Sequence, residues 1–156
     1  MAEDLGIITE EVEALRDDFN LPGMKILQFA FDGNCKNPYL PMNYISNSVA
    51  YTGTHDNDTT LGWFESLNDT DKHRVYDQLG WSSLPMPCAL VHEAMTSVAA
   101  LAVVPMQDVL RLGGTHRMNT PGTVEGNWRW RFSWDQLDED KAGRLAHFIR
   151  ISNRHP

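Results

Sequence analysis

The fold is decided by the run Val49-Ala50-Tyr51-Thr52-Gly53 and by the polar cluster Thr54-His55-Asp56-Asn57-Asp58 that follows it. The apolar run predicts a buried strand, and the cluster marks the place where that strand ends. In folds built from parallel strands, ligands and reacting groups gather at the carboxyl ends of the strands. Carboxylates beside a histidine at such a place are typical of sugar chemistry or of metal binding.

Two other segments repeat this pattern of a buried run with polar side chains near its end. Residues 24–31 are apolar at nearly every position and include Gln28, and residues 99–105 are followed by Gln107-Asp108. Such runs are typical of parallel strands that are covered on both faces. The segments around them predict helices over residues 8–20, 57–67, 70–80, 87–98 and 138–151, and a short helix that follows Met106-Gln107-Asp108 and runs to Leu112. They also predict loops over 32–47 and 113–127 and a short extended piece over 128–134.

The alternation of buried strands with helices predicts parallel βα units and an α/β fold class. Three strands are too few to close a barrel. We therefore expect residues 1–156 to be the C-terminal portion of a (β/α)8 TIM barrel domain, with about three parallel strands and an incomplete barrel. Glu3-Asp4 would then follow a strand that this chain lacks. The isolated chain would expose unpaired apolar edges, and we expect poor solubility, self-association or a molten state.

The composition limits the kinds of partner and the cellular location that we expect for this protein. The chain has 156 residues and a formal net charge of −8, which disfavours nucleic acid and anionic membranes and suits a neutral ligand. No apolar run is long enough to span a bilayer. The start of the chain has neither the basic nor the apolar region of a secretory signal. Cys35 and Cys88 form no close pair and predict free thiols, so we expect a cytoplasmic protein.

Several blocks of sequence, in their order along the chain, carry a specific resemblance. They are Ala2-Glu3-Asp4-Leu5-Gly6, Leu21-Pro22-Gly23-Met24-Lys25, Leu27-Gln28-Phe29-Ala30-Phe31, Tyr51-Thr52-Gly53-Thr54-His55-Asp56-Asn57-Asp58-Thr59, Pro105-Met106-Gln107-Asp108, Arg117-Met118-Asn119-Thr120-Pro121-Gly122 and Gly126-Asn127-Trp128. Through them the chain resembles the 4-α-glucanotransferases, the amylomaltase or disproportionating-enzyme family of the α-amylase clan. The resemblance implies transfer of an α-1,4-glucan segment between maltooligosaccharides by a retaining double displacement.

The resemblance also implies roles for individual residues. Glu3 is the general acid/base, and Asp56, with His55 beside it, holds the hydroxyls of the sugar that is cleaved. The remaining candidate substrate contacts are Asp4, Phe29 (on the acceptor side), Asn119 and Asn127. The nucleophilic Asp of the family lies upstream of Glu3, so the rest of the barrel is expected to be needed for activity. We expect no cofactor.

These residue types suit the chemistry of glycosidic bonds. An alkoxide is a poor leaving group, and a Glu in a dry pocket can supply the proton that it needs near neutral pH. Retention requires a second carboxylate about 5–5.5 Å away. If the acceptor is a sugar hydroxyl instead of water, the enzyme is a transferase. Trp128, Trp130 and Trp134 could form stacking platforms for sugar rings, or could pack as core against the last helix.

Other interpretations stay open from the residues alone. The chain could belong to a hydrolase of the same clan, or could form a non-catalytic carbohydrate-binding module. Glu3-Asp4 could be an exposed terminus, and Asp56 or Asn57 could cap the helix that follows. Asp56 and Asp58 could bind a metal, but the segment lacks the glycine and the distal Glu of a calcium loop, so we expect no metal.

Overall fold

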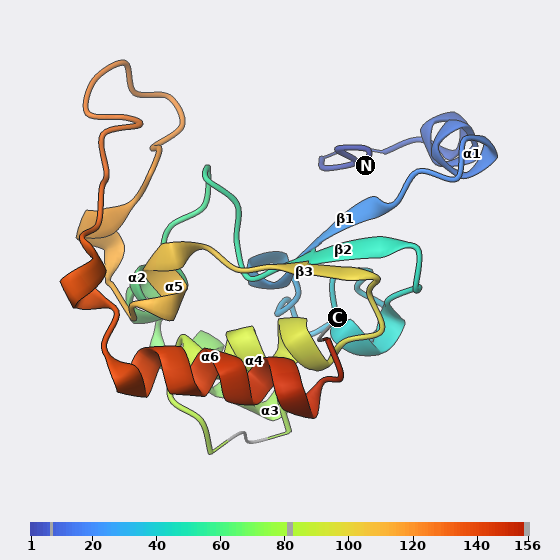
Figure 1. The fold of residues 1–156 in the computed structure, drawn as a ribbon. Helices are drawn as coiled ribbons and strands as arrows, with labels where there is room; N and C mark the ends of the chain where they lie inside the picture. The colour runs from blue at the N-terminus through green and yellow to red at the C-terminus, as the bar shows by residue number, and fades with distance from the viewer. Residues whose placement is uncertain (7, 81–82, 155–156) are drawn as a thin grey trace.

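The structure, a computed structural model, describes residues 1–6, 8–80 and 83–154. Three strands, β1 (Gly23–Ile26), β2 (Ser48–Tyr51) and β3 (Leu101–Val103), form a parallel sheet in the order β1-β2-β3 (Figure 1). Ile26 pairs with Tyr51, and Tyr51 pairs with Val103, so the three strands end together at one edge of the sheet. The predicted α/β class with three parallel strands is confirmed.

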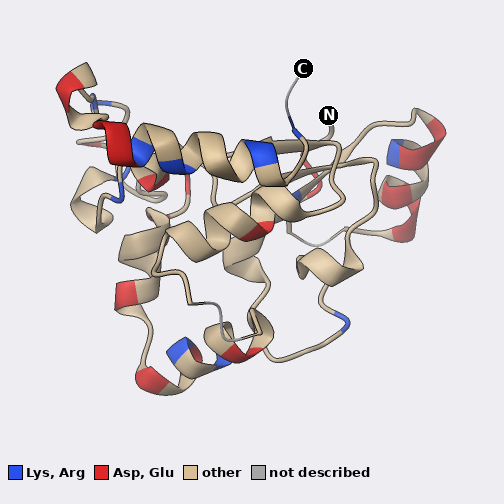
Figure 2. Cartoon of the chain, turned by 60° about the horizontal axis from the view of Figure 1, so that its bottom comes forward, with Lys and Arg blue, Asp and Glu red and all other residues tan. Residues whose placement is uncertain are grey.

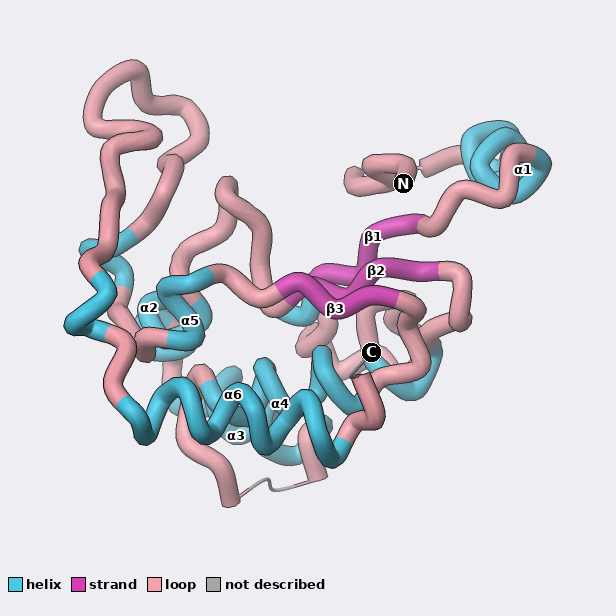
Figure 3. Tube along the Cα trace, viewed as in Figure 1, coloured by secondary structure: helices cyan, strands magenta, loops and turns pink. Residues whose placement is uncertain are grey.

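Each predicted helix has a counterpart in the described residues, but the short helix predicted between Asp108 and Leu112 begins earlier, at Met106, and ends at Val109. The helices are α1 (Glu10–Asp18), α2 (Thr60–Ser66), α3 (Asp69–Gln78), α4 (Cys88–Thr96), α5 (Met106–Val109) and α6 (Glu139–Ile151). α3, α4 and α6 lie on the same side of the sheet (Figure 1). α4 packs against β2 and β3, and α6 packs against α4. Long loops follow β2 and α5 and rise on one side of the molecule (Figure 3).

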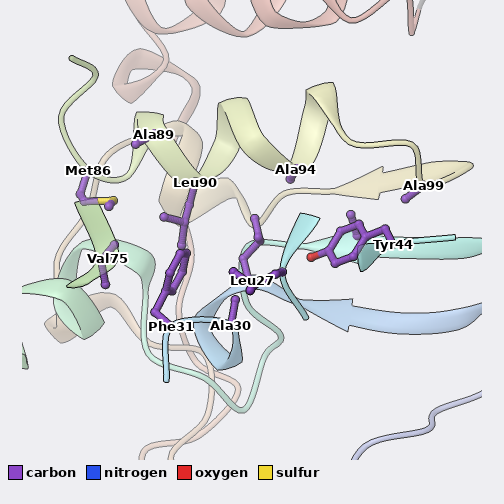
Figure 4. Packing of buried hydrophobic residues seen from close by; sticks show 12 residues of the cluster. Leu27, Ala30, Phe31, Tyr44, Val75, Met86, Ala89, Leu90, Ala94 and Ala99 are labelled. Carbon is purple, nitrogen blue, oxygen red and sulfur yellow. The ribbon is translucent and has the colours of Figure 1, made fainter. Parts of the chain in front are cut away.

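An apolar core fills the space between the sheet and the helices beside it (Figure 4). Leu27, Ala50 and Leu90 are all fully buried there. Removing a Leu side chain from water contributes roughly 1.5–3 kcal/mol. A second cluster joins α4 to α6 through Cys88, Val91, Met95 and Phe148. These two clusters anchor the helices to one face of the sheet, which leaves the carboxyl ends of the strands to other side chains.

The predicted strand over residues 24–31 is too long. β1 ends at Ile26, and Leu27–Phe29 form a 3₁₀ turn. This turn places Leu27 and Ala30 in the core. An apolar run cannot by itself distinguish a strand from a buried turn, because both need the same side chains.

The aromatic piece over residues 128–134 is not a strand of the sheet. Trp128 lies in a turn with a φ of 62°, and Trp134–Gln136 form a 3₁₀ turn. Trp130 stacks on Phe132, with ring centroids 6.0 Å apart. Trp134 is 75% exposed, so the interpretation of these tryptophans as core packing fails for this residue.

One helix stands apart from the others. α1 lies away from the other helices (Figure 1) and contains no buried residue. Its apolar side chains Val12 and Leu15 are exposed, as is Phe19 at its C-cap. α1 carries Arg16 among mostly acidic charged residues, and α6 also carries residues of both charges (Figure 2). β3 exposes Leu101 as well. Exposed apolar surface of this kind is what an incomplete barrel implies, and the self-association of the isolated chain stays a prediction. No helix in the described ranges is long and apolar enough to cross a bilayer.

Candidate active site

A cavity of about 580 Å³ opens beside the carboxyl ends of the strands. Its walls come from the N-terminal segment, from the loop after β2 and from the loop that follows α5. The polar and aromatic residues that line it include Glu3, His55, Asp56, Asp58, Arg117 and Trp128. Glu3 and Asp56 are far apart in the sequence, and the structure brings them together around this one space.

The segment that carries Glu3 is tied to β1. The Ala2 amide donates to the Pro22 carbonyl at 3.0 Å. The buried Asp4 carboxylate accepts a hydrogen bond from the Met24 amide at 2.6 Å and pairs with Arg16 at 2.8 Å. The interpretation of Glu3-Asp4 as a loose, exposed terminus therefore fails for Asp4, which is buried and held, whereas the Glu3 side chain is exposed at the cavity.

Asp4 lies outside the cavity lining, although the sequence predicts it as a substrate contact. Successive side chains of an extended segment point to opposite sides, so a Glu3 that faces the cavity sends Asp4 toward β1. A Cβ atom at Gly23 would collide with the Asp4 carboxylate, so this position requires glycine. Asp4 acts as the anchor of its neighbour Glu3 and does not reach the cavity.

The loop after β2 is held by its own side chains. The Asn57 Oδ1 atom accepts hydrogen bonds from the amide and the hydroxyl of Thr54, at 2.8 and 2.9 Å. Gln28 donates to the Asp58 carbonyl at 2.9 Å. α2 is capped by Thr59, whose side chain accepts from the Gly62 amide. The alternative in which Asp56 or Asn57 caps this helix is therefore wrong, and the Asp56 carboxylate is left for other contacts.

The Asp56 carboxylate is half-exposed and faces several donors. The Asn119 amide donates to its Oδ1 atom at 2.6 Å, and His55 Nε2 lies 3.3 Å from the same atom. The His55 ring packs on Trp128, with centroids 4.9 Å apart. Arg117 donates to the backbone carbonyl of Asp56 at 2.9 Å. The carboxylate is thus oriented by neighbours and remains open to the cavity.

The structure places Phe29, Asn119 and Asn127 outside the cavity lining as well. Phe29 is half-exposed on the 3₁₀ turn and packs edge-on against Tyr39, with centroids 5.5 Å apart. Asn127 accepts from the Thr120 amide at 2.9 Å and donates to the Thr123 carbonyl at 3.0 Å. The side-chain amide of Asn127 therefore bridges backbone groups of its own loop. Asn119 is used on Asp56, as described above.

A buried carboxylate, that of Asp108, holds the loop that follows β2. Asp108, on α5, is 2% exposed and accepts hydrogen bonds from the Thr52 hydroxyl at 2.6 Å and from the Thr60 amide and hydroxyl at 2.9 and 2.7 Å. Thr52 and Thr60 flank the loop that carries His55 and Asp56, so one side chain fastens both of its ends. Burial raises the pKa of Asp108, and the hydrogen bonds from Thr52 and Thr60 oppose that rise.

Sequence reasoning assigned no role to Arg117 or Asp108, although it noted both motifs. The signal for Asp108 was a carboxylate directly after a buried strand. The signal for Arg117 was a cation in a loop expected on the same side as Asp56. Among the described residues, no three His, Cys, Asp or Glu side chains gather as they would around a metal ion.

Comparison with known proteins agrees with this geometry. Residues 1–137 match the sequence profile of a family described as 4-alpha-glucanotransferase. The chain belongs to the 4-alpha-glucanotransferase family. Over 99% of its length it is 52% identical to a 4-alpha-glucanotransferase of Synechocystis, and 45% identical to a chloroplastic/amyloplastic 4-alpha-glucanotransferase of Oryza sativa.

A solved structure of this family has the same fold. The chain superposes over 99% of its length on an amylomaltase from Streptococcus agalactiae in complex with acarbose, with a TM-score of 0.94 and 35% identity. The chain covers 32% of that amylomaltase, 31% of the Synechocystis protein and 27% of the rice protein. The prediction that this chain forms part of a (β/α)8 barrel is confirmed, and the chain spans about a third of the length of these relatives.

Proposed function

We propose that residues 1–156 supply the acid/base side of the glucan cleft in a 4-α-glucanotransferase. The observation that carries the proposal is the shared cavity, which Glu3 lines from the N-terminal segment and Asp56 lines from the loop after β2. Family membership favours glucan transfer over the two other classes, a hydrolase and a binding module. The substrates would be maltooligosaccharides and other α-1,4-glucans, such as those from starch or glycogen.

In this proposal each carboxylate has its own task. Glu3 protonates the glycosidic oxygen as the bond breaks, and later removes the proton from the 4-hydroxyl of the acceptor sugar. Asp56 accepts hydrogen bonds from ring hydroxyls, and those bonds strengthen as the ring flattens in the transition state. Trp128, beside His55, offers an aromatic face to a sugar ring. The covalent intermediate needs a second carboxylate about 5–5.5 Å from Glu3, which the rest of the barrel would supply.

Two features of the relatives bear on substrate and location. The amylomaltase from Streptococcus agalactiae was solved with acarbose, which supports an oligosaccharide ligand for the present cavity. We propose a cytoplasmic location, and the chloroplastic/amyloplastic designation of the rice relative shows that the family is not confined to the cytoplasm. A membrane or nucleic-acid partner has no support in the charge of −8.

A chimera tests the proposal. Residues 1–156 replace the matching segment of the Synechocystis 4-alpha-glucanotransferase, and the purified chimera is incubated with maltotriose. We expect glucose and longer glucans as products. Glu3→Gln should lower the transfer rate about 10²–10⁴-fold, because it removes the acid/base. Glu13→Gln, on the exposed face of α1, is the matched control and should leave the rate unchanged.

Two results would overturn the proposal. One is a folded chimera that produces no longer glucans, or that releases only short hydrolysis products. The other is a Glu3→Gln chimera that retains the full rate. Circular dichroism and gel filtration establish in each case that the chimera is folded.

A further inference from the structure

We infer that Arg117 is a positioning residue that fixes Asp56 for glucan transfer. This inference rests on the proposed function, in which Asp56 holds the reacting sugar. Arg117 itself need not touch the substrate. Its guanidinium links the loop after α5 to the loop after β2 and determines where the Asp56 carboxylate stands.

The guanidinium reaches both loops at once. Its Nη2 atom donates to the Asp56 carbonyl at 2.9 Å, and its Nη1 atom lies 3.8 Å from the Asp58 carboxylate. Its Nε atom donates to the Asn119 carbonyl at 3.2 Å, within its own loop. The planar fork of Arg presents these donors in fixed directions, and a Lys ammonium cannot reproduce them.

Arg117 also acts on the Asp56 side chain through Asn119. The Asn119 amide donates to Asp56 Oδ1 at 2.6 Å, and the carbonyl of Asn119 is held by Arg117. One cation therefore fixes both the backbone of Asp56 and the residue that orients its carboxylate. Asp56 is half-exposed, and apart from Asn119 its carboxylate lies near His55 Nε2 at 3.3 Å. Loss of Arg117 would therefore leave the carboxylate freer to adopt other positions.

Two other roles make different predictions. A direct sugar contact by Arg117 would strengthen substrate binding, so its loss would raise KM more than it lowers kcat. A purely structural role would lower stability and leave the turnover of the folded enzyme unchanged. A positioning role lowers kcat, and it does so only while Asp56 is present, because two residues that act as one unit are not additive.

The test uses the chimera defined above with maltotriose as substrate. Arg117→Gln should lower kcat about 10- to 100-fold with KM changed less than about threefold, since a displacement of about 1 Å at a reacting group can cost 10²-fold. Arg117→Lys should recover only part of the loss. In the Asp56→Asn background, Arg117→Gln should lower kcat less than about twofold further. Arg150→Gln, on exposed α6, is the matched control and should have no effect.

Several outcomes would overturn the inference. They are a kcat within about twofold of the parent in folded Arg117→Gln, a loss carried by KM alone, or a full additional loss in the Asp56→Asn background. If Arg117→Gln does not fold, Arg117→Lys decides by the same criteria. An inactive but folded parent chimera refutes the proposed function, whereas an active parent with a fully active Arg117→Gln refutes only the role of Arg117.

Discussion

Replacement of Asp108 by Ala should release both ends of the loop that carries Asp56. Asp108 accepts three hydrogen bonds from Thr52 and Thr60. Because Asp108 is only 2% exposed, bulk water does not provide these donors with another acceptor when the carboxylate is removed. Three bonds at about 1 kcal/mol each, plus about 1–3 kcal/mol for the Thr60 amide left buried without an acceptor, give a cost of about 4–6 kcal/mol. Asp108→Asn keeps the shape and one acceptor oxygen, and should cost about 1–2 kcal/mol.

Amide hydrogen exchange at Thr60 in the chimera measures this cost locally. A loss of about 4 kcal/mol corresponds to exchange about 10³-fold faster, because each 1.4 kcal/mol is a factor of ten. Asp77→Asn, on the exposed face of α3, is the control and should leave the exchange of Thr60 unchanged. Exchange within tenfold of the parent in folded Asp108→Ala would refute the idea that Asp108 fastens the loop.

The pH dependence provides a second check on the same residue. Burial raises the pKa of Asp108, so the folded state holds this proton at higher pH than the unfolded chain does. The stability that the carboxyl contributes is therefore fully present below the unfolded pKa of about 3.9 and is lost as the pH rises through the folded pKa. Relative to the parent, the unfolding temperature of Asp108→Asn should rise with pH above about 4. A difference that stays constant with pH would contradict this account.

Two further predictions follow from single contacts. Thr59→Ala removes the side-chain cap of α2 and should lower the free energy of unfolding of the chimera by about 1 kcal/mol in urea titration, whereas Thr59→Ser should retain the cap. Phe19→Glu, at the C-cap of α1, should reduce self-association of the isolated chain in analytical ultracentrifugation, because it places a charge among the exposed apolar side chains Val12, Leu15 and Phe19. An isolated chain that is already monomeric would contradict the second prediction.

Local patterns predicted much of the fold. The apolar runs at 49–53 and 99–105 contain β2 and β3. β2 is buried, as an apolar run predicts for a strand covered on both faces, whereas Leu101 and Val103 of the predicted buried strand β3 are exposed. The run at 24–31 predicts one strand, yet residues 27–29 form a 3₁₀ turn, and Leu27 and Ala30 enter the core. The length of a buried strand depends on the elements that pack against it. An apolar run of sequence contains no information about those elements.

For the candidate site, too, the sequence predicted some of the arrangement correctly and some of it incorrectly. The motifs around Glu3 and Asp56 placed both residues at strand ends, and the structure puts both on one cavity. The same motifs grouped Asp4, Phe29 and Asn127 with them as substrate contacts. In the structure Asp4 pairs with Arg16, and Phe29 packs against Tyr39. Asn127 forms hydrogen bonds with the backbone of Thr120 and Thr123.

The sequence by itself determined the family and the α/β class, because these depend on residue type and on spacing along the chain. Only the tertiary structure decided which side chains meet. The contacts of Asp56 with Arg117 and Asn119 join residues 61 and 63 positions apart, and those of Asp108 with Thr52 and Thr60 span 56 and 48. Such distant pairs are set by how the strands and loops pack together, and no local pattern encodes that arrangement.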